Sequence, residues 1–211
     1  MTLLAASLRK DLVVLVPDQE MKATLMGIFK TYDRLQTRKI DLYGLYVDPH
    51  HDSGVYQRSH EFLRPFLRLA GHCLVVFDRD GCGSTKPREE IESEVESHLA
   101  QNGWAGRSAV IVIDPELENW VWSDSPHVET ALGWPVGGKL KTWLVENRFL
   151  GTDSVKPVRP KEALLEALRV VKRQRSSSIY VQLAQQVSFQ RCSDPAFIKL
   201  KTVLLNWFPK D

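Results

Sequence analysis

Cysteine is scarce in this chain, and the three cysteines present form no recognisable pattern. Cys73, Cys82 and Cys192 are widely spaced along the 211 residues and never occur as a CxxC pair. Disulfide frameworks and structural zinc sites both need paired or clustered cysteines, so neither is expected here. The scarcity of cysteine favours a reducing compartment, and we expect a cytoplasmic protein.

Long hydrophobic runs are also missing. No apolar stretch approaches the roughly 20 residues that a membrane-spanning helix needs, which argues against a transmembrane protein. At the N-terminus, the apolar part of MTLLAASLRKD precedes its charges, the reverse of the order in a secretory signal. Hydrophobic residues make up 43% of the chain and charged residues 26%, which are the proportions of an ordinary globular protein.

The chain lacks the two common glycine-rich loops that hold nucleotide phosphates. The glycine-containing segment GCGS (81–84) does not fit the GxxxxGK[ST] pattern of a P-loop. No GxGxxG follows the first apolar run. A nucleotide cradle is therefore not expected.

Apolar runs that alternate with helical patterns predict the fold class. Three such runs indicate buried strands, at 11–17, 72–78 and 108–114. Residues 38–47, where Ile40, Leu42 and Leu45 alternate unevenly with polar residues, indicate a further strand, the second along the chain. Helical spacing is found between them, at 19–32, at 55–69 with an interruption at Pro65, and at 87–100. The segment DPHHDSG after the second strand is predicted to be a turn. Strands that alternate with helices predict an α/β fold with a Rossmann-like, mainly parallel sheet and helices on both faces.

The second part of the chain has no strand-like runs. Helical patterns continue at about 137–147, 160–172, 178–188 and 195–206, with a loop or linker at 151–160. We therefore expect an α/β core over residues 1–125 and a helical C-terminal extension over 126–211 that packs on this core. Proline at position 115 is expected to start a helix directly after the fourth strand.

Charge is distributed unevenly although the formal net charge is only +2. Residues 78–124 contain eleven acidic and four basic residues, whereas residues 156–211 contain eleven basic and four acidic residues. An acidic zone followed by a basic tail fits a metal site beside a surface that binds a polyanion. The alternative is that both segments are solvated helix faces.

Acidic residues follow every predicted strand. They are Asp18 and Glu20 after the first strand, Asp48 and Asp52 after the second, Asp78 and Asp80 after the third, and Asp114, Glu116 and Glu118 after the fourth. In an open parallel sheet, ligands bind beyond the carboxyl ends of the strands. Clustered carboxylates repel one another unless a cation lies between them, and oxygen ligands suit Mg²⁺ or Mn²⁺. Asp78, Asp80, Glu116 and Glu118 are therefore candidate ligands of Mg²⁺ or Mn²⁺.

The sequence Asp78-Arg79-Asp80 is the sharpest local feature. Residues i and i+2 of a strand point to the same face, so two aspartates at a strand end can present both carboxylates to one or two metal ions. The glycines at positions 81 and 83 allow the chain to turn away tightly. The alternative is that Asp80 only caps this turn.

The order of these features resembles the TOPRIM domain, the metal-binding fold of topoisomerases, primases and OLD-like nucleases. LVPDQEMKATLMGIF resembles its first strand and helix, CLVVFDRDG its strand ending in DxD, and IVIDPELENWVWSD the next strand of OLD-like and related small stand-alone bacterial TOPRIM proteins. The resemblance covers about residues 11–125. It implies phosphoryl transfer assisted by Mg²⁺ or Mn²⁺, with Asp78, Asp80 and Glu118 holding the metal and Glu20 acting as base or further ligand.

One departure from the family leaves two functions open. The glutamate that the family carries at the end of its first strand is replaced by Val16 and Pro17, and only Asp18 and Glu20 remain nearby. The chain is expected to be a metal-dependent nuclease acting on DNA or RNA, with a role in bacterial defence against foreign nucleic acid. The alternative is a catalytically impaired module that binds nucleic acid or a partner protein. A third, weaker option is a receiver-like hydrolase of small phosphate esters.

The expected partners follow from the basic tail and from the resemblance. The basic side chains expected to contact the phosphate backbone are Arg169, Lys172, Arg173 and Arg175. The resemblance adds other proteins of a defence system and a homodimer as expected partners.

Three further motifs have plain alternatives. His50 and His51 could take part in a transition-metal site, but a polar turn is the simpler interpretation. Cys82 could be a reactive thiol, but a small loop residue is simpler. The segment GGK (137–139) could hold a phosphate through its backbone, or simply begin a helix.

Overall fold

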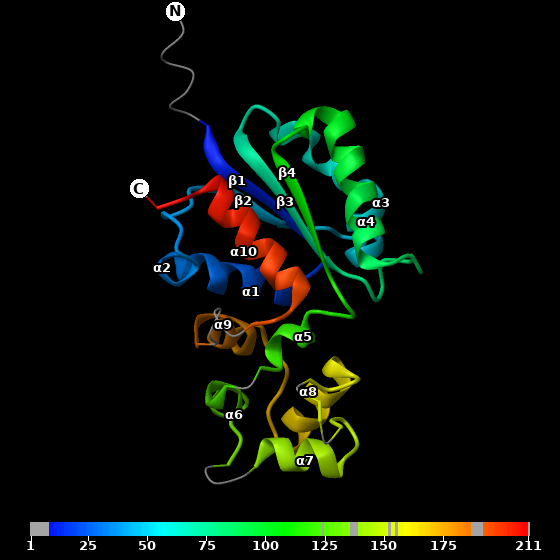
Figure 1. The fold of residues 1–211 in the computed structure, drawn as a ribbon, viewed down its shortest axis with the longest axis vertical. Helices are drawn as coiled ribbons and strands as arrows, with labels where there is room; N and C mark the ends of the chain where they lie inside the picture. Colours follow the sequence, from blue (N-terminus) through cyan, green and yellow to red (C-terminus); the bar gives the residue numbers. More distant parts are fainter. Residues whose placement is uncertain are drawn as a thin grey trace, which may run out of the picture.

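The chain folds around a four-stranded sheet whose strands all run parallel (Figure 1). The computed structural model describes residues 9–123, 125–135, 139–151, 153–154, 156–186 and 192–210. The strands are β1 (Lys10–Val16), β2 (Leu42–Val47), β3 (Ala70–Asp78) and β4 (Ser108–Ile113). Their order across the sheet is β2-β1-β3-β4, so β1 and β3 form its centre and β2 and β4 its edges.

The strands form where the apolar runs predict them because both faces of the sheet are covered. In β1 every residue from Leu12 to Val16 is fully buried, and the inner part of β3 is buried in the same way. Val14 lies opposite Leu45 of β2 on one side and Leu74 of β3 on the other. A strand buried on both faces needs apolar residues at successive positions rather than at alternate ones.

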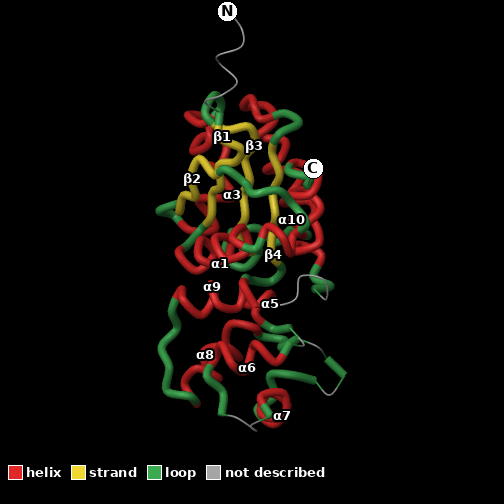
Figure 2. Tube along the Cα trace, turned by 90° about the vertical axis from the view of Figure 1, so that its left-hand side faces the viewer, coloured by secondary structure: helices red, strands yellow, loops and turns green. Residues whose placement is uncertain are grey.

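Helices cover the two faces of the sheet. On one face lie α3 (His51–Leu63) and α4 (Arg88–Leu99), and on the other lie α1 (Gln19–Lys30) and α10 (Pro195–Trp207) (Figures 1 and 2). Because side chains alternate along each strand, β1 contributes Val13 to the first core layer and Val14 to the second.

The remaining helices are short, and most of them lie beyond the carboxyl edge of the sheet. They are α2 (Tyr32–Leu35), η2 (Arg64–Phe66), η3 (Ala100–Trp104), α5 (Glu118–Val121), α6 (Pro126–Leu132), α7 (Leu140–Glu146), α8 (Pro160–Val170) and α9 (Ser177–Gln186). After β4 the chain runs through α5 to α8 away from the sheet, and then returns as α9 against α1 and as α10 against β4 (Figure 1). The last helix therefore completes the cover of the sheet.

The predicted alternation and the parallel sheet are confirmed, but two local predictions are wrong. The predicted turn over DPHHDSG is mostly helix, because α3 already begins at His51. The interruption expected at Pro65 is confirmed, since α3 ends at Leu63 and Pro65 lies in the short helix η2. The helix predicted at Pro115 begins only at Glu118.

The helical patterns predicted for the second part of the chain correspond to α7, α8, α9 and α10, whereas the sequence did not predict α6. Gly137 and Gly138 of the GGK motif lie outside the described residues. Among the described helices, none is both long and apolar enough to cross a membrane.

Candidate functional site

The carboxyl edge of the sheet brings together one acidic residue from the end of each strand. Asp18 follows β1, Asp52 lies in the first turn of α3 after β2, Asp78 ends β3, and Glu118 begins α5 after β4. The charges of Asp18, Asp52 and Glu118 all act on the carboxyl group of Asp78. Asp78 is therefore the central member of this group, which we call the carboxylate edge (Asp18, Asp52, Asp78 and Glu118).

The carboxyl group of Asp78 is buried and incompletely satisfied. The residue is 8% exposed, and its Oδ1 atom has no hydrogen-bond partner. Burial raises the pKa of Asp78 well above its ordinary value, and the negative charge of Asp52 raises it further, while the backbone of Leu117 acts in the opposite direction. A buried acceptor without a donor is unfavourable, so this oxygen is suited to receive a proton or a cation.

Asp52 is bound directly to the end of β3. Its Oδ1 atom accepts a hydrogen bond of 2.9 Å from the backbone N–H of Asp78. Burial raises the pKa of Asp52, and the charge of Asp18 adds to this effect, whereas Lys161 lowers it. Gly81 passes close to the same carboxyl with φ of 94°, and a Cβ at this position would lie 3.4 Å from Asp52 Oδ2. That distance is an ordinary van der Waals contact, so glycine is suited to this turn by its backbone angle.

The two candidates after β1 have different roles in the structure. Asp18 is the N-cap of α1, and its Oδ1 accepts a hydrogen bond of 2.7 Å from the backbone N–H of Met21. Glu20 lies in the first turn of α1, is half-buried, and its charge raises the pKa of Arg175. Asp18 thus caps α1 through Oδ1 while its charge acts on Asp78, whereas the charge of Glu20 acts on Arg175.

Glu118 is held by two residues of the C-terminal half. It is 1% exposed, and its Oε1 accepts hydrogen bonds from Arg175 Nη2 at 2.9 Å and from the Tyr180 hydroxyl at 2.6 Å. Burial and the charge of Glu118 both raise the pKa of Tyr180, so the phenol keeps its proton and remains a donor. The charge of Glu118 is thus already balanced by Arg175.

Asp80 and Glu116 lie at the periphery of this edge. Asp80 is exposed, and its backbone N–H donates to the carbonyl of Pro115 at 3.0 Å. Burial raises the pKa of Glu116, and the charge of Asp80 contributes in the same direction. Glu116 Oε1 accepts a hydrogen bond of 2.8 Å from the backbone N–H of Lys161, whose ammonium lies 3.9 Å from Oε2. Lys161 therefore brings a positive charge from α8 to the carboxylate edge.

The four basic residues expected to bind nucleic acid differ in their exposure and in their contacts within the protein. Arg169 has a side chain 82% exposed and lies 3.7 Å from Glu166, and Lys172 is exposed. Arg173 donates to the carbonyl oxygen of Ala131 at 2.7 Å, and Arg175 binds Glu118. Arg169 and Lys172 thus face solvent, whereas Arg173 and Arg175 make contacts within the protein.

The other sequence motifs do not join the carboxylate edge. Cys82 is buried, and burial raises the pKa of its thiol, which works against a reactive thiolate. His50 precedes α3, and its Nδ1 receives a hydrogen bond of 2.7 Å from Arg58. The adjacent His51 is exposed and begins that helix with a φ of 55°.

The chemistry of these side chains suits a hard cation, but the geometry is not that of a complete site. Throughout the described part of the chain, no three or more His, Cys, Asp or Glu side chains form a group that could hold a metal ion. The orphaned Asp78 Oδ1 and the carboxyl of Asp52 are the oxygens best suited to a Mg²⁺ or Mn²⁺ ion. A bound cation would offset the charges that now raise the pKa of both residues.

Three residues of this region were not among the residues that the sequence predicted for the site. Asp52 follows the second strand, but its neighbours His50 and His51 made the segment resemble a polar turn. Lys161 and Tyr180 come from distant helices, and no local motif marks either of them. The position of Asp52 after a strand was therefore the only usable signal.

Comparison of the chain with models of protein families, with curated protein sequences and with solved structures gives no match.

Proposed function

We propose that the carboxylate edge binds Mg²⁺ or Mn²⁺ and that the chain is a nuclease that hydrolyses phosphodiester bonds, with a Rossmann-like fold of the TOPRIM type. The observation that carries this proposal is the buried Asp78, whose Oδ1 lacks a hydrogen-bond partner while three other acidic residues act on it. A buried carboxyl oxygen without a hydrogen-bond partner is costly to the fold, and such costs concentrate at functional sites.

The residues around Asp78 can be assigned separate tasks. Asp78 and Asp52 would hold the cation, with Asp18 and Asp80 nearby as further oxygen ligands. When bound, the cation would polarise the scissile phosphate and lower the pKa of an attacking water. Lys161, whose ammonium lies 3.9 Å from Glu116 Oε2 and whose charge acts on Asp52, would bind a phosphate oxygen. Glu20 would serve as the local base.

The basic C-terminal half supports a polyanionic substrate. Arg169 and Lys172 are exposed at the end of α8, the helix whose first turn carries Lys161. Basic side chains at both ends of this helix would bind successive phosphate groups of a nucleic acid. Such contacts do not depend on the base sequence. The role in bacterial defence and the protein partners that the resemblance implies stay predictions.

The test combines cation binding with cleavage. Isothermal titration with Mn²⁺ and Mg²⁺ would measure affinity, and supercoiled plasmid, single-stranded DNA and RNA would serve as substrates. We expect Asp78→Asn to weaken cation binding by about tenfold or more and to abolish cleavage. The matched control is Asp114→Asn, because Asp114 follows β4 but is partly exposed and pairs with Arg79 at 3.2 Å. Equal behaviour of the two variants, or cleavage that persists in EDTA, would refute the proposal.

A second candidate function is a module that binds nucleic acid without cutting it. The observation that favours it is Glu118, whose Oε1 is already occupied by Arg175 and Tyr180. This candidate predicts binding that survives EDTA and Asp78→Asn, with no cleavage of any substrate. Arg169→Gln should then weaken binding, whereas Lys30→Gln, at an exposed lysine that ends α1, should not.

A further inference from the structure

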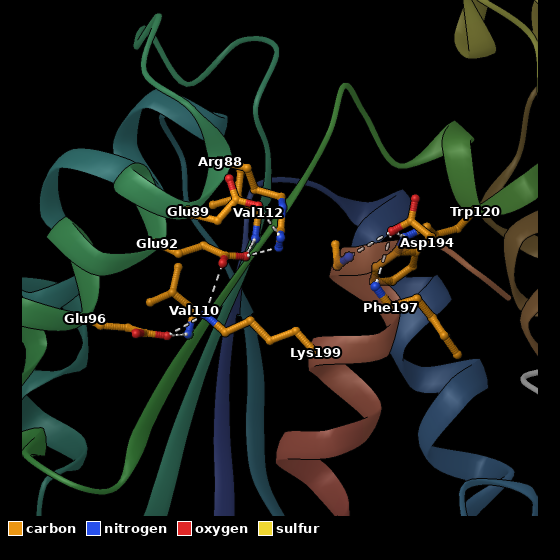
Figure 3. A network of polar contacts seen from close by, with 11 residues as sticks. Arg88, Glu89, Glu92, Glu96, Val110, Val112, Trp120, Asp194, Phe197 and Lys199 are labelled. Atoms are coloured by element: carbon orange, nitrogen blue, oxygen red, sulfur yellow. Dashed lines mark hydrogen bonds and ion pairs between the residues drawn. The ribbon is translucent and has the colours of Figure 1, made fainter.

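The two edge strands of the sheet differ in whether side chains bind their outward backbone groups, and in β4 they do. Along β4 the backbone N–H of Val110 donates to Glu96 Oε1 at 3.0 Å, and that of Val112 donates to Glu92 Oε1 at 2.9 Å (Figure 3). Both carboxylates belong to α4 and take the place that a neighbouring strand would occupy. The outward backbone donors of Val110 and Val112 are therefore already used.

Two cations hold these carboxylates in place. Lys199 of α10 donates from Nζ to Glu92 Oε2 at 3.1 Å and to Glu96 Oε1 at 2.8 Å (Figure 3). Arg88 Nη1 donates to Glu92 Oε1 at 3.0 Å. A strand that added to β4 would have to displace this whole network, so the β4 edge is protected against pairing.

The β2 edge has no such protection. In the described part of the chain, β2 pairs with β1 alone, and no side chain there donates to or accepts from its backbone. The N–H of Asp48, directly after β2, donates to the carbonyl of Val16 in β1 at 2.9 Å. Because backbone groups alternate in direction along a strand, those of Leu45 and Val47 point away from β1. This edge forms one border of the sheet (Figure 2).

Aromatic side chains lie beside this open edge. Tyr43 is 38% exposed, and its ring lies 5.4 Å from that of Phe66. Tyr46 packs against the same Phe66 at 4.9 Å and against Phe62 at 5.9 Å. Partly exposed aromatic residues are enriched in protein interfaces, where they bury a large area at low cost in side-chain entropy. We call this group the aromatic patch (Tyr43, Tyr46, Phe62 and Phe66).

The charges at the two ends of β2 are complementary to each other. Lys39 precedes the strand and is exposed, and no ion pair of the described residues involves its ammonium. A hollow of about 280 Å³ at the other end of β2 is lined by Asp48, His50, Arg58 and Glu61. Arg58 donates to His50 and keeps its positive charge, and Asp48 Oδ1 accepts the backbone N–H of His50 at 2.8 Å. The hollow thus contains two carboxylates and one guanidinium, an excess of negative charge. An antiparallel copy of the same strand would bring Lys39 of one molecule toward the hollow of the other.

We propose that β2 pairs with β2 of a second copy of this chain in an antiparallel, two-fold arrangement. The two sheets then form one continuous sheet of eight strands, and the two aromatic patches meet beside the new strand pair. Antiparallel pairing directs the carboxylate edges of the two molecules to opposite ends of this sheet. The inference rests on the edges and is independent of the proposed catalytic function.

The oligomeric state tests this proposal. Sedimentation velocity from about 1 µM to about 1 mM should show a monomer–dimer equilibrium of the full chain. Tyr43→Lys should weaken the dimer by about tenfold or more, because a charge on an edge strand opposes strand addition. Leu69→Lys is the matched control, since Leu69 is a comparably exposed apolar residue (40%) before β3, and it should leave the dimer unchanged.

Hydrogen exchange locates the contact within the dimer. Amides of residues 42–47 should exchange more slowly as the protein concentration rises, and this protection should disappear in Tyr43→Lys. A chain that stays monomeric over the whole concentration range overturns the proposal, and so does an edge that binds only a foreign peptide. A dimer whose protection maps to β4 or to the C-terminal helices overturns it as well.

Discussion

Glu118 is a carboxylate that the protein neutralises internally. Its Oε1 accepts one hydrogen bond from a cation and one from a phenol, and the side chain is almost wholly removed from solvent. Breaking a buried pair of this kind costs more than forming it contributes, because the remaining charge is left without a partner. The contact also ties α5, directly after the sheet, to the segment that leads into α9.

The hydroxyl of Tyr180 should therefore matter for stability. Tyr180→Phe removes the 2.6 Å hydrogen bond to Glu118 and the acceptor of Arg175 Nε, which lies 2.8 Å from the hydroxyl. We expect the free energy of unfolding to fall by about 1.5–3 kcal/mol, the range for hydrogen bonds to charged groups. Urea denaturation at pH 7, followed by circular dichroism, measures this change.

The same substitution at Tyr56 provides the control. The Tyr56 hydroxyl donates to Glu94 Oε2 at 3.1 Å, but Glu94 is partly exposed and also binds Lys86. Tyr56→Phe should cost about 1 kcal/mol or less. Losses of equal size in the two variants would contradict the idea that Glu118 depends on its buried partners.

These partnerships show what a sequence can reveal about a site. The acidic residue after each strand could be predicted, because parallel strands end at one edge and the apolar runs locate those ends. The use of Glu118 could not be predicted, since Arg175 and Tyr180 follow it by 57 and 62 residues and only the folded chain brings them together. For Asp52 the position after a strand was visible, but the turn-forming residues around it gave no sign that it would join the site.

At the scale of elements, the contact between α1 and α9 depends on a glycine. Gly27 is buried in the middle of α1, and a Cβ placed there would lie 2.8 Å from Ala184 Cβ and 3.1 Å from the carbonyl oxygen of Val181. Both atoms belong to α9, and the carbonyl is backbone that cannot move without the helix. The close approach of the two helices therefore requires a residue without a side chain at position 27.

Gly27→Ala should thus destabilise the protein, although alanine is the better helix former. In an exposed helix this change stabilises by about 1 kcal/mol, whereas here we expect a loss of about 1–3 kcal/mol from overpacking. Thermal and urea unfolding measure the sign directly. Adding Ala184→Gly should recover part of the loss in a double-mutant cycle, and a stabilised Gly27→Ala variant would show that the helices are not in close contact.

Helices and strands could be predicted from the sequence where burial determines the spacing of apolar residues. They could not be predicted where the local residues favour both a helix and a turn. The strands β1, β3 and β4 could be predicted because they are buried on both faces and occur as continuous apolar runs. In β2 only Leu45 is buried, and an uneven alternation of apolar residues indicated this strand. The start of α3 could not be predicted, because its first turn, HDSG, is composed of residues that also favour turns. Tertiary packing of Val55 and Leu63, both fully buried, selects the helix.

At the scale of the whole molecule, one hydrophobic core connects the two halves of the chain. The buried cluster on the α1 side of the sheet includes Val14 and Ile111 from the strands together with Leu183 of α9 and Leu200 of α10. The C-terminal helices therefore complete the core of the sheet as well as extending beyond its edge. The division at residue 125 suggested by the sequence stays a prediction. Because both parts contribute to the same core, the first part is not expected to fold alone.

A chain cut after residue 125 should fail to form a cooperative fold. It would lose α10, which covers β4, and α9, which packs on α1, and so would expose the apolar face that carries Val14 and Ile111. Exposed apolar surface of this size favours loosely packed or aggregated states. We expect weak near-ultraviolet circular dichroism, binding of the dye ANS and a broad urea transition, compared with a single sharp transition for the full chain. A sharp transition in the truncated chain would instead show that the sheet, α1, α3 and α4 form an independent unit, and that the C-terminal helices are an appendage.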